Sequence, residues 1–157
     1  TKYGPLVYRR ALKILGNPAH AEEATQDIFI RVINGIEKFD GRSQLSSWLF
    51  RITTNHCLNR IRDAQRRREL WREQVAPVEK TSTDSGDPAT KLLTRQLLAE
   101  ADPQQALAAV CVYMEGMSGD ETAAHLGVSR RTVTNLLERF KTWARERVDD
   151  DSDHPPP

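Results

Sequence analysis

Between Trp48 and Arg66 the sequence places one aromatic ring, two amides and three guanidinium groups at intervals of three or four residues. On an α-helix these intervals keep side chains on one face. An aromatic ring can stack on a base, amides can hydrogen-bond to base edges, and arginines can pair with phosphates. Stacking contributes roughly 1–3 kcal/mol per base in single-strand binding, so this face predicts contact with nucleic acid. The residues of this face, termed the Trp48–Arg66 stripe, are Trp48, Arg51, Asn55, Asn59, Arg62 and Arg66.

The charge around the stripe is strongly positive. Residues 51–72 hold seven arginines against two acidic residues, a net charge of +5, although the whole chain carries only +1. A basic block in a nearly neutral protein favours a polyanion-binding face. The alternative is a solvated face on which Trp48 covers a small core. That interpretation would suit a lone tryptophan, whereas the complete stripe favours nucleic acid.

The elements that must position the stripe are helices. The stripe-bearing helix is expected from about Ser46 into the arginine block. Its other side is apolar and is expected to pack on two earlier helices, through Leu49, Phe50, Thr53, Cys57 and Ile61. The first of these is predicted at Gly4–Leu15, ended by Gly16. Asn17-Pro18 then provides an N-cap with proline at the first helical position, and the second helix breaks near Gly35.

A second pattern of residues with a possible function begins at Ser118. Residues 118–126 predict a short helix, Gly127 its C-terminal glycine, and Ser129 the N-cap of a longer helix, which is the helix-turn-helix pattern of DNA-binding proteins. Small and apolar residues suit the tight corner, namely Ala123, Ala124, Leu126, Val128 and Val133. Arginines at the start of the second helix can pair with guanine in the major groove. The candidate groove-facing residues are Arg130, Arg131, Thr132, Thr134, Asn135 and Arg139. The alternative is a helical hairpin with solvated arginines.

The predicted fold class is all-α, with two small helical domains joined by a flexible linker. The 157 residues are divided into a first domain at 1–72, a linker at 73–90, a second domain at 91–148 and a disordered acidic and proline-rich tail at 149–157. Pro77, Pro88 and the polar stretch KTSTDSG mark the linker. Asp102-Pro103 predicts a further helix start inside the second domain.

Several classes of function are disfavoured. Cys57 and Cys111 have no metal-ligand spacing, so both are expected to be buried structural thiols, and no metal or other cofactor is expected. No Ser/His/Asp grouping or phosphate-binding glycine loop indicates an enzyme. No apolar run approaches the ~20 residues of a membrane helix and no signal peptide is visible, so a cytoplasmic protein without membrane insertion is expected. The chain begins at Thr1 rather than methionine, which leaves room for a preceding segment.

From Tyr3 to Val148 the sequence resembles the extracytoplasmic-function (ECF) branch of bacterial RNA polymerase sigma factors. The stretch AEEATQDIFIRVINGIEKFDGRSQLSSWLFRITTNHCLNRIRDAQRR resembles region 2, a helical bundle, and EGMSGDETAAHLGVSRRTV resembles region 4, a helix-turn-helix. The order and spacing of the two stretches strengthen the resemblance. It implies a non-enzymatic factor that binds core RNA polymerase, through the clamp of the β′ subunit and the flap of the β subunit, and promoter DNA. It also implies an anti-sigma factor as a regulatory partner and a linker that threads the polymerase channel.

The resemblance assigns roles to individual residues. Core-polymerase binding falls to an acidic and amide-bearing helix face, Glu22, Glu23, Gln26, Asp27 and Arg31. Melting and capture of the −10 element fall to the loop residues Phe39, Arg42 and Ser43 together with the Trp48–Arg66 stripe. Reading of the −35 element falls to the groove-facing residues of the helix-turn-helix. Many family members carry Thr-Val-x-Ser-Arg in that helix, whereas Thr134-Asn135-Leu136 follow Val133 here, so the −35 preference is left open.

The leading hypothesis is a sigma factor that directs promoter recognition, −10 melting and transcription initiation. The alternative is a stand-alone helix-turn-helix transcription regulator whose N-terminal module senses a ligand or dimerises. The Trp48–Arg66 stripe distinguishes them, because a protein that binds only duplex DNA needs no surface on which unpaired bases stack.

Overall fold

The computed structural model describes residues 2–41, 44–71 and 88–152, and within these ranges the chain is helical and contains no strand. Packing divides the chain into two compact units, Thr1–Ala99 and Glu100–Pro157. The predicted all-α class with two helical domains is therefore confirmed. None of the helices in the described ranges combines the length and apolar character needed to cross a membrane.

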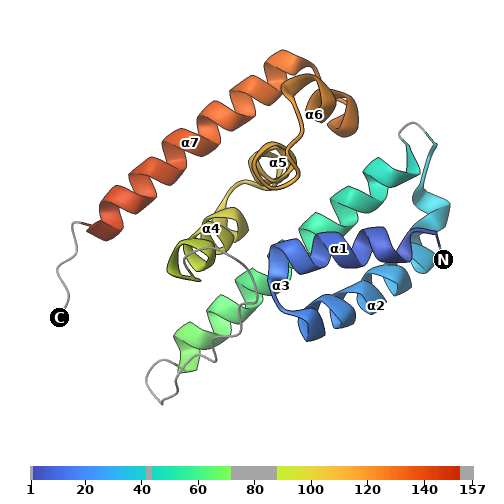
Figure 1. Ribbon diagram of the computed structural model, residues 1–157, viewed down its shortest axis with the longest axis horizontal. Helices are drawn as coiled ribbons and strands as arrows, with labels where there is room; N and C mark the ends of the chain where they lie inside the picture. Colours follow the sequence, from blue (N-terminus) through green and yellow to red (C-terminus); the bar gives the residue numbers. More distant parts are fainter. Residues whose placement is uncertain (1, 42–43, 72–87, 153–157) are drawn as a thin grey trace. The chain divides into compact units, whose positions relative to one another are not determined.

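The first unit is built on three helices that pack on one another: α1 at Gly4–Leu15, α2 at Pro18–Gly35 and α3 at Leu45–Trp71 (Figure 1). A short 3₁₀ turn, η1 at Ile36–Lys38, follows α2. The bundle encloses the hydrophobic core, whose buried members are Val7, Ala11, Ile14, Ala21, Ala24, Ile28, Val32, Leu49, Phe50, Cys57 and Leu58. Full burial of a large aliphatic or aromatic side chain contributes roughly 1.5–3 kcal/mol, so these residues hold the three helices together.

Local signals set the junction between α1 and α2. Gly16 ends α1 in the left-handed region, with φ of 72°, and its N–H donates to the carbonyl of Leu12 at 2.8 Å. The side-chain oxygen of Asn17 then accepts hydrogen bonds from the N–H groups of Ala19 and His20, at 2.9 and 3.2 Å. Both boundaries agree with the prediction, because glycine tolerates positive φ and asparagine satisfies the free N–H groups of a helix start.

The predicted apolar side of α3 faces the core. Leu49, Phe50, Thr53 and Cys57 are all buried, while Ile61 is half-buried. The guanidinium of Arg10 on α1 lies over the ring of Phe50, 4.4 Å from its centroid, a cation–π contact between the two helices. Burial also raises the pKa of the Cys57 thiol to about 12, so this cysteine stays protonated. Cys111 is buried in the second unit, which confirms the prediction of two buried thiols.

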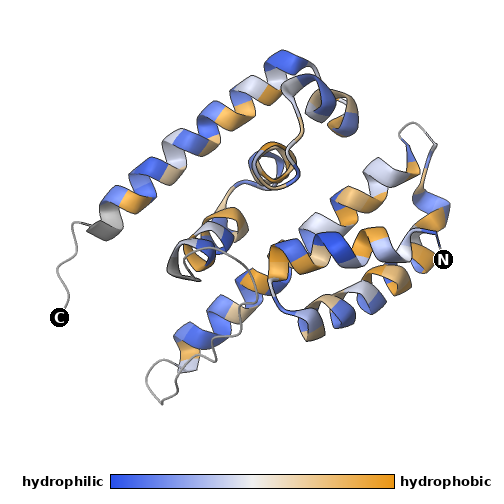
Figure 2. Cartoon of the chain, in the orientation of Figure 1, coloured by the Kyte–Doolittle hydropathy of each residue, from blue (hydrophilic) through white to orange (hydrophobic). Residues whose placement is uncertain are grey.

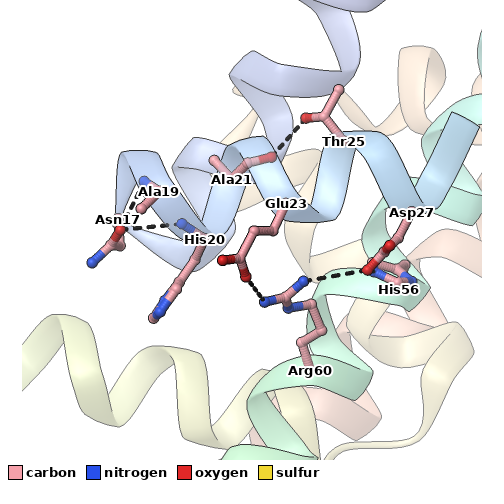
Figure 3. Close-up of polar contacts among 9 residues, drawn as sticks. All are labelled: Asn17, Ala19, His20, Ala21, Glu23, Thr25, Asp27, His56 and Arg60. Atoms are coloured by element: carbon pink, nitrogen blue, oxygen red, sulfur yellow. Dashed lines mark hydrogen bonds and ion pairs between the residues drawn. The ribbon is translucent and has the colours of Figure 1, made fainter.

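Four ionisable side chains connect α2 to α3. Arg60 of α3 pairs with Glu23 of α2 at 3.0 Å and with Asp27 at 3.6 Å (Figure 3). The imidazole of His56 is buried and lies 3.9 Å from the same Asp27 carboxylate. Burial lowers the pKa of His56 below its ordinary value of 6.5, Arg31 and Arg60 lower it further, and Asp27 opposes them. His56 is therefore neutral at pH 7.

The helix α4 at Pro88–Glu100 shows where the domain boundaries differ from the sequence prediction. Residues 72–87, most of the predicted linker, lie outside the described residues. Residues 88–90, also assigned to the linker, belong to α4, and α4 groups with the first unit as far as Ala99. The sequence placed residues 91–99 with the second domain because their helical pattern continues toward Asp102. Hydrogen bonds that join α4 to α1 and to α3, described below, associate α4 with the first unit instead. These bonds connect residues that are far apart in the sequence.

The second unit contains α5 at Pro103–Ala109, a π-helical turn η2 at Val110–Met114, α6 at Gly119–Leu126 and α7 at Arg130–Ser152. Its core includes Leu107, Val110, Cys111, Leu126 and Val133. Hydrophilic residues cover much of α7 (Figure 2). This helix continues to Ser152, so residues 149–152 of the tail, expected to be disordered, are helical. Composition alone missed this, because a helix that is already nucleated extends through residues that would not start one.

The α2–α3 connection predicts a pH-dependent stability. The pKa of His56 is lowered in the folded chain, so below pH 6.5 the unfolded chain binds this proton more readily. The contribution of neutral His56 to the free energy of unfolding is therefore complete above about pH 6.5. It is lost as the pH falls toward the pKa that His56 has in the folded chain. His56→Gln, which cannot titrate, should therefore lose less stability than the wild type between about pH 7.5 and pH 5 in urea denaturation. His20→Gln, at an exposed position of α2, controls for the loss of an imidazole, and equal pH dependence of wild type and His56→Gln would contradict the prediction.

Candidate nucleic-acid interface

The Trp48–Arg66 stripe lies on the accessible side of α3. Asn55, Asn59 and Arg66 are exposed, while Trp48, Arg51 and Arg62 are partly exposed, so none of the six is buried. Leu49, Phe50, Cys57 and Leu58 of the same helix are buried in the bundle, whereas Leu70 and Trp71 at its end are exposed. The helix is thus divided into a packing side and an open side, as the three- and four-residue spacing predicts.

Trp48 and Phe39 form an aromatic pair at the start of α3. Their ring centroids are 5.2 Å apart with the planes tilted by 44°. Phe39 is half-buried and follows η1, and its N–H donates to the carbonyl of Ile36 at 3.2 Å. The structure therefore brings together two of the predicted −10 residues from separate elements. Arg42 and Ser43, also predicted for this loop, lie outside the described residues.

Arg62 is engaged within the protein. Its Nε and Nη2 atoms donate to the carbonyl oxygen of Ala99 at 2.9 and 2.5 Å, and its Nη1 donates to Oδ1 of Asn59 at 3.2 Å. The structure thus joins two stripe residues, Asn59 and Arg62, and turns one edge of the Arg62 guanidinium toward α4. Sequence spacing could not reveal this contact, because the two partners are 37 residues apart.

The predicted polymerase-binding face on α2 is exposed at every position, namely Glu22, Glu23, Gln26, Asp27 and Arg31. Two of these residues already have partners, since Glu23 and Asp27 pair with Arg60. From the sequence, Arg60 was expected only as one of the seven arginines of the basic block at residues 51–72. Its position four residues after His56, away from the stripe, is the signal that could have assigned it to the α2–α3 contact.

Exposed isoleucines extend the same α2 face. Ile30 and Ile33 are 57% and 71% exposed, whereas Ile28 and Val32 are buried. Neither isoleucine belongs to a site predicted from the sequence. A helical wheel places Ile30 and Ile33 on the side of α2 opposite Ile28 and Val32. They lie two and five positions beyond Ile28, and such positions turn away from the core.

The helix-turn-helix is set by three local caps. Ser118 and Glu121 form a capping box at the start of α6. Gly127, with φ of 69°, ends α6, and the N–H groups of Gly127 and Val128 donate to the carbonyl of Ala123. The Oγ of Ser129 accepts from the N–H of Thr132 at 3.1 Å, which confirms Ser129 as the N-cap of α7.

Fewer residues are buried in the corner between α6 and α7 than the sequence predicts. Ala123, Leu126 and Val133 are buried, as expected. Ala124 and Val128 are exposed, so their predicted roles in the corner are wrong. The left-handed turn at Gly127 directs Val128 outward, and Ala124 follows Ala123 by one residue, about 100° around the helix.

The candidate groove-facing residues of α7 are accessible, with Thr132 half-buried and the other five exposed. Arg130 lies 3.6 Å from the carboxylate of Asp120 on α6, and both side chains are more than 70% exposed. The hydroxyl of Thr134 donates to the carbonyl of Arg130. Arg139 also lines an open hollow of about 350 Å³ with Gln105 of α5 and Trp143.

Comparison with known proteins agrees with both units. Residues 1–67 match the family model described as Sigma-70 region 2, and residues 99–149 match the one described as a homeodomain-like domain. The fold and the two matches define a helical protein that combines a sigma-70 region 2 with a helix-turn-helix. The chain belongs to the ECF family of RNA polymerase sigma factors.

Individual relatives support this assignment. The chain is 32% identical to the ECF RNA polymerase sigma factor SigE of Mycolicibacterium smegmatis over 149 residues, and 33% identical to SigM of Mycobacterium tuberculosis over 121 residues. These alignments cover 89% and 77% of the chain and 56% and 60% of the two relatives, so the chain spans little more than half their length. The structure of the sigma factor RpoE from Bartonella quintana, solved in complex with the anti-sigma factor NepR, is similar in fold. Its TM-score is 0.53 at 19% identity, with 94% of this chain and 92% of that chain covered.

Proposed function

We propose that this chain binds core RNA polymerase and directs promoter recognition, −10 melting and transcription initiation. The observation that carries the proposal is the division of α3. Its packing side is buried, while an aromatic ring, amides and arginines occupy the open side of a unit that matches sigma-70 region 2. A helix-turn-helix with exposed arginines at the start of α7 supplies a second, separate DNA-binding surface.

The −10 element is the proposed ligand of the Trp48–Arg66 stripe. The Phe39–Trp48 pair offers an aromatic surface on which an unpaired base can stack, and Asn55 offers an exposed amide about two turns further along α3. Arg66 and its neighbours in sequence supply charge for the phosphates. Phosphate contacts add affinity for either form of DNA, whereas stacking favours the separated strand because its bases are unpaired. Binding energy then drives melting without catalysis.

The clamp of the β′ subunit is the proposed partner of the α2 face. Exposed carboxylates at Glu22, Glu23 and Asp27 suit a basic surface, and Ile30 and Ile33 add apolar area that has no role within the bundle. The flap of the β subunit is the proposed partner of the second unit, and the −35 element is the proposed ligand of α7. An anti-sigma factor is the proposed regulator, supported by family membership and by the fold shared with RpoE, which was solved with NepR.

Transcription with purified core polymerase tests the function directly. The chain should convert core bacterial RNA polymerase into an enzyme that initiates at a specific promoter, and it should co-elute with core on gel filtration. Failure to bind core at all would favour the alternative of a stand-alone regulator. Glu22→Lys together with Gln26→Lys should weaken core binding, because the first substitution reverses a negative charge on the α2 face and the second adds a positive charge, both at positions without a described partner inside the bundle.

Substitutions in the Trp48–Arg66 stripe should impair melting of the −10 element and spare binding of duplex DNA. Trp48→Ala or Asn55→Ala should leave −35 duplex affinity unchanged and lower open-complex formation about tenfold, equivalent to the loss of one stacked or hydrogen-bonded base. Permanganate reactivity of thymines near the start site measures the open complex. Asn34→Ala, an exposed amide on α2 outside the stripe, is the matched control. Equal loss of both steps would assign the stripe a structural role.

Substitutions at the start of α7 should impair recognition of the −35 sequence. Arg130→Ala and Arg131→Ala should each weaken promoter binding, and whichever arginine contacts a base should relax selectivity at one −35 position by about 1–3 kcal/mol. Competition binding with single-base variants of the promoter measures this. Arg145→Ala, an exposed arginine farther along α7, controls for the lost charge. Unchanged affinity in both variants would exclude the start of α7 as the reading surface.

A further inference from the structure

Two arginines in the first unit each donate to a carbonyl at the end of another helix. Arg95 of α4 donates from Nε to the carbonyl oxygen of Ile14, in the last turn of α1, at 2.7 Å. Arg62 of α3 donates from Nε and Nη2 to the carbonyl oxygen of Ala99, in the last turn of α4. One arginine therefore holds α4 to α1, and the other holds α3 to α4.

The acceptors are well suited to a guanidinium. The last four carbonyls of a helix have no partner within the helix, and they lie at the negative end of its dipole. A positively charged donor satisfies such a carbonyl and neutralises part of this charge, which makes the hydrogen bond stronger than one between neutral groups. Both arginines are half-buried, which limits the competition from water.

Gly16 leaves room for the Arg95 guanidinium in its observed position. A Cβ atom at this position would collide with the Nη2 and Cζ atoms of the Arg95 guanidinium. The same glycine has φ of 72°, which ends α1 and presents the Ile14 carbonyl. A single residue thus ends α1 and leaves the space that Arg95 occupies.

The Arg62 contact involves a residue of the proposed −10 surface. The Nε and Nη2 atoms form one edge of the planar guanidinium, which is able to pair with two oxygens of a phosphate. In the structure both atoms donate to Ala99, so this edge is directed at α4 and cannot pair with a phosphate at the same time. We propose that α4 is an intramolecular strap, fastened to α1 by Arg95, that shields Arg62 from DNA; the inference rests on the proposed role of the stripe in binding single-stranded DNA.

The strap is able to release. Leu92 and Leu93 remain 40% and 38% exposed, so the first half of α4 is incompletely buried. A phosphate is a stronger acceptor for Arg62 than a neutral carbonyl, which favours exchange of Ala99 for DNA. Only Ala101 and Asp102 separate α4 from α5, so a displacement of the second unit is transmitted to α4 through the chain.

Removing the Arg95 guanidinium tests the strap in the full chain. In Arg95→Ala the amides of residues 92–99 should exchange hydrogen about tenfold faster, because α4 is no longer held to α1. Affinity for a fluorescein-labelled, mixed-sequence 20-nucleotide single-stranded DNA, measured by anisotropy, should rise about threefold to tenfold. This direction is opposite to the effect expected from losing a positive charge. Arg95→Gln, which keeps a polar side chain of similar length, should behave in the same way if Arg95→Ala folds poorly.

Arg9→Ala is the matched control, since it removes one exposed positive charge from α1 of the same unit. It should leave α4 exchange unchanged and should not raise DNA affinity. Unchanged exchange of α4 in both Arg95 variants would overturn the strap, and faster exchange without a rise in DNA affinity would overturn the shielding of Arg62. Arg62→Ala in the Arg95→Ala background separates the two proposals. If the double variant keeps the raised single-strand affinity of Arg95→Ala, the proposed DNA contact of Arg62 fails, whereas faster α4 exchange in Arg95→Ala would still establish the strap.

Discussion

The first unit depends on the packing of α3 against α1, in which the buried guanidinium of Arg10 lies over the buried ring of Phe50. A buried guanidinium over a fully buried ring fixes which side of α3 meets α1. Leu49, Thr53 and Cys57 continue that side along the helix. With the packing side fixed, the helical repeat leaves the opposite side to Trp48, Asn55 and Asn59, so the accessible chemistry of the unit follows from the burial of one face.

The polar contact between α2 and α3 connects two proposed surfaces. Arg60 and His56 of α3 meet Glu23 and Asp27 of α2, the helix proposed to bind polymerase. The two acidic side chains are more than half exposed, so each ion pair contributes only about 0–1 kcal/mol to stability. Their greater effect is to orient α2 against the helix that bears the stripe proposed to bind DNA. The hydrogen bonds between Arg62 and Ala99 of α4 add a second connection to that helix.

The second unit depends more on local signals. Ser118, Gly127 and Ser129 each cap a helix through hydrogen bonds that span no more than five residues. The helix-turn-helix was therefore predictable in detail, including the exposure of Arg130 and Arg131. The errors, at Ala124 and Val128, concern which small residues face the corner, and that depends on the turn geometry rather than on residue type.

The sequence alone determined the helices, their caps, the two faces of α3 and the family resemblance, because these depend on residues a few positions apart and on the helical period. Only the tertiary structure decided which side chains within those faces are engaged. Arg62 is joined to Ala99, Arg95 to Ile14, and Arg60 to Glu23, in each case across at least 37 residues of sequence. Hydrogen bonds of this kind depend on how the helices pack, and no local pattern encodes the partner. The assignment of α4 to the first unit rests on the same long-range contacts.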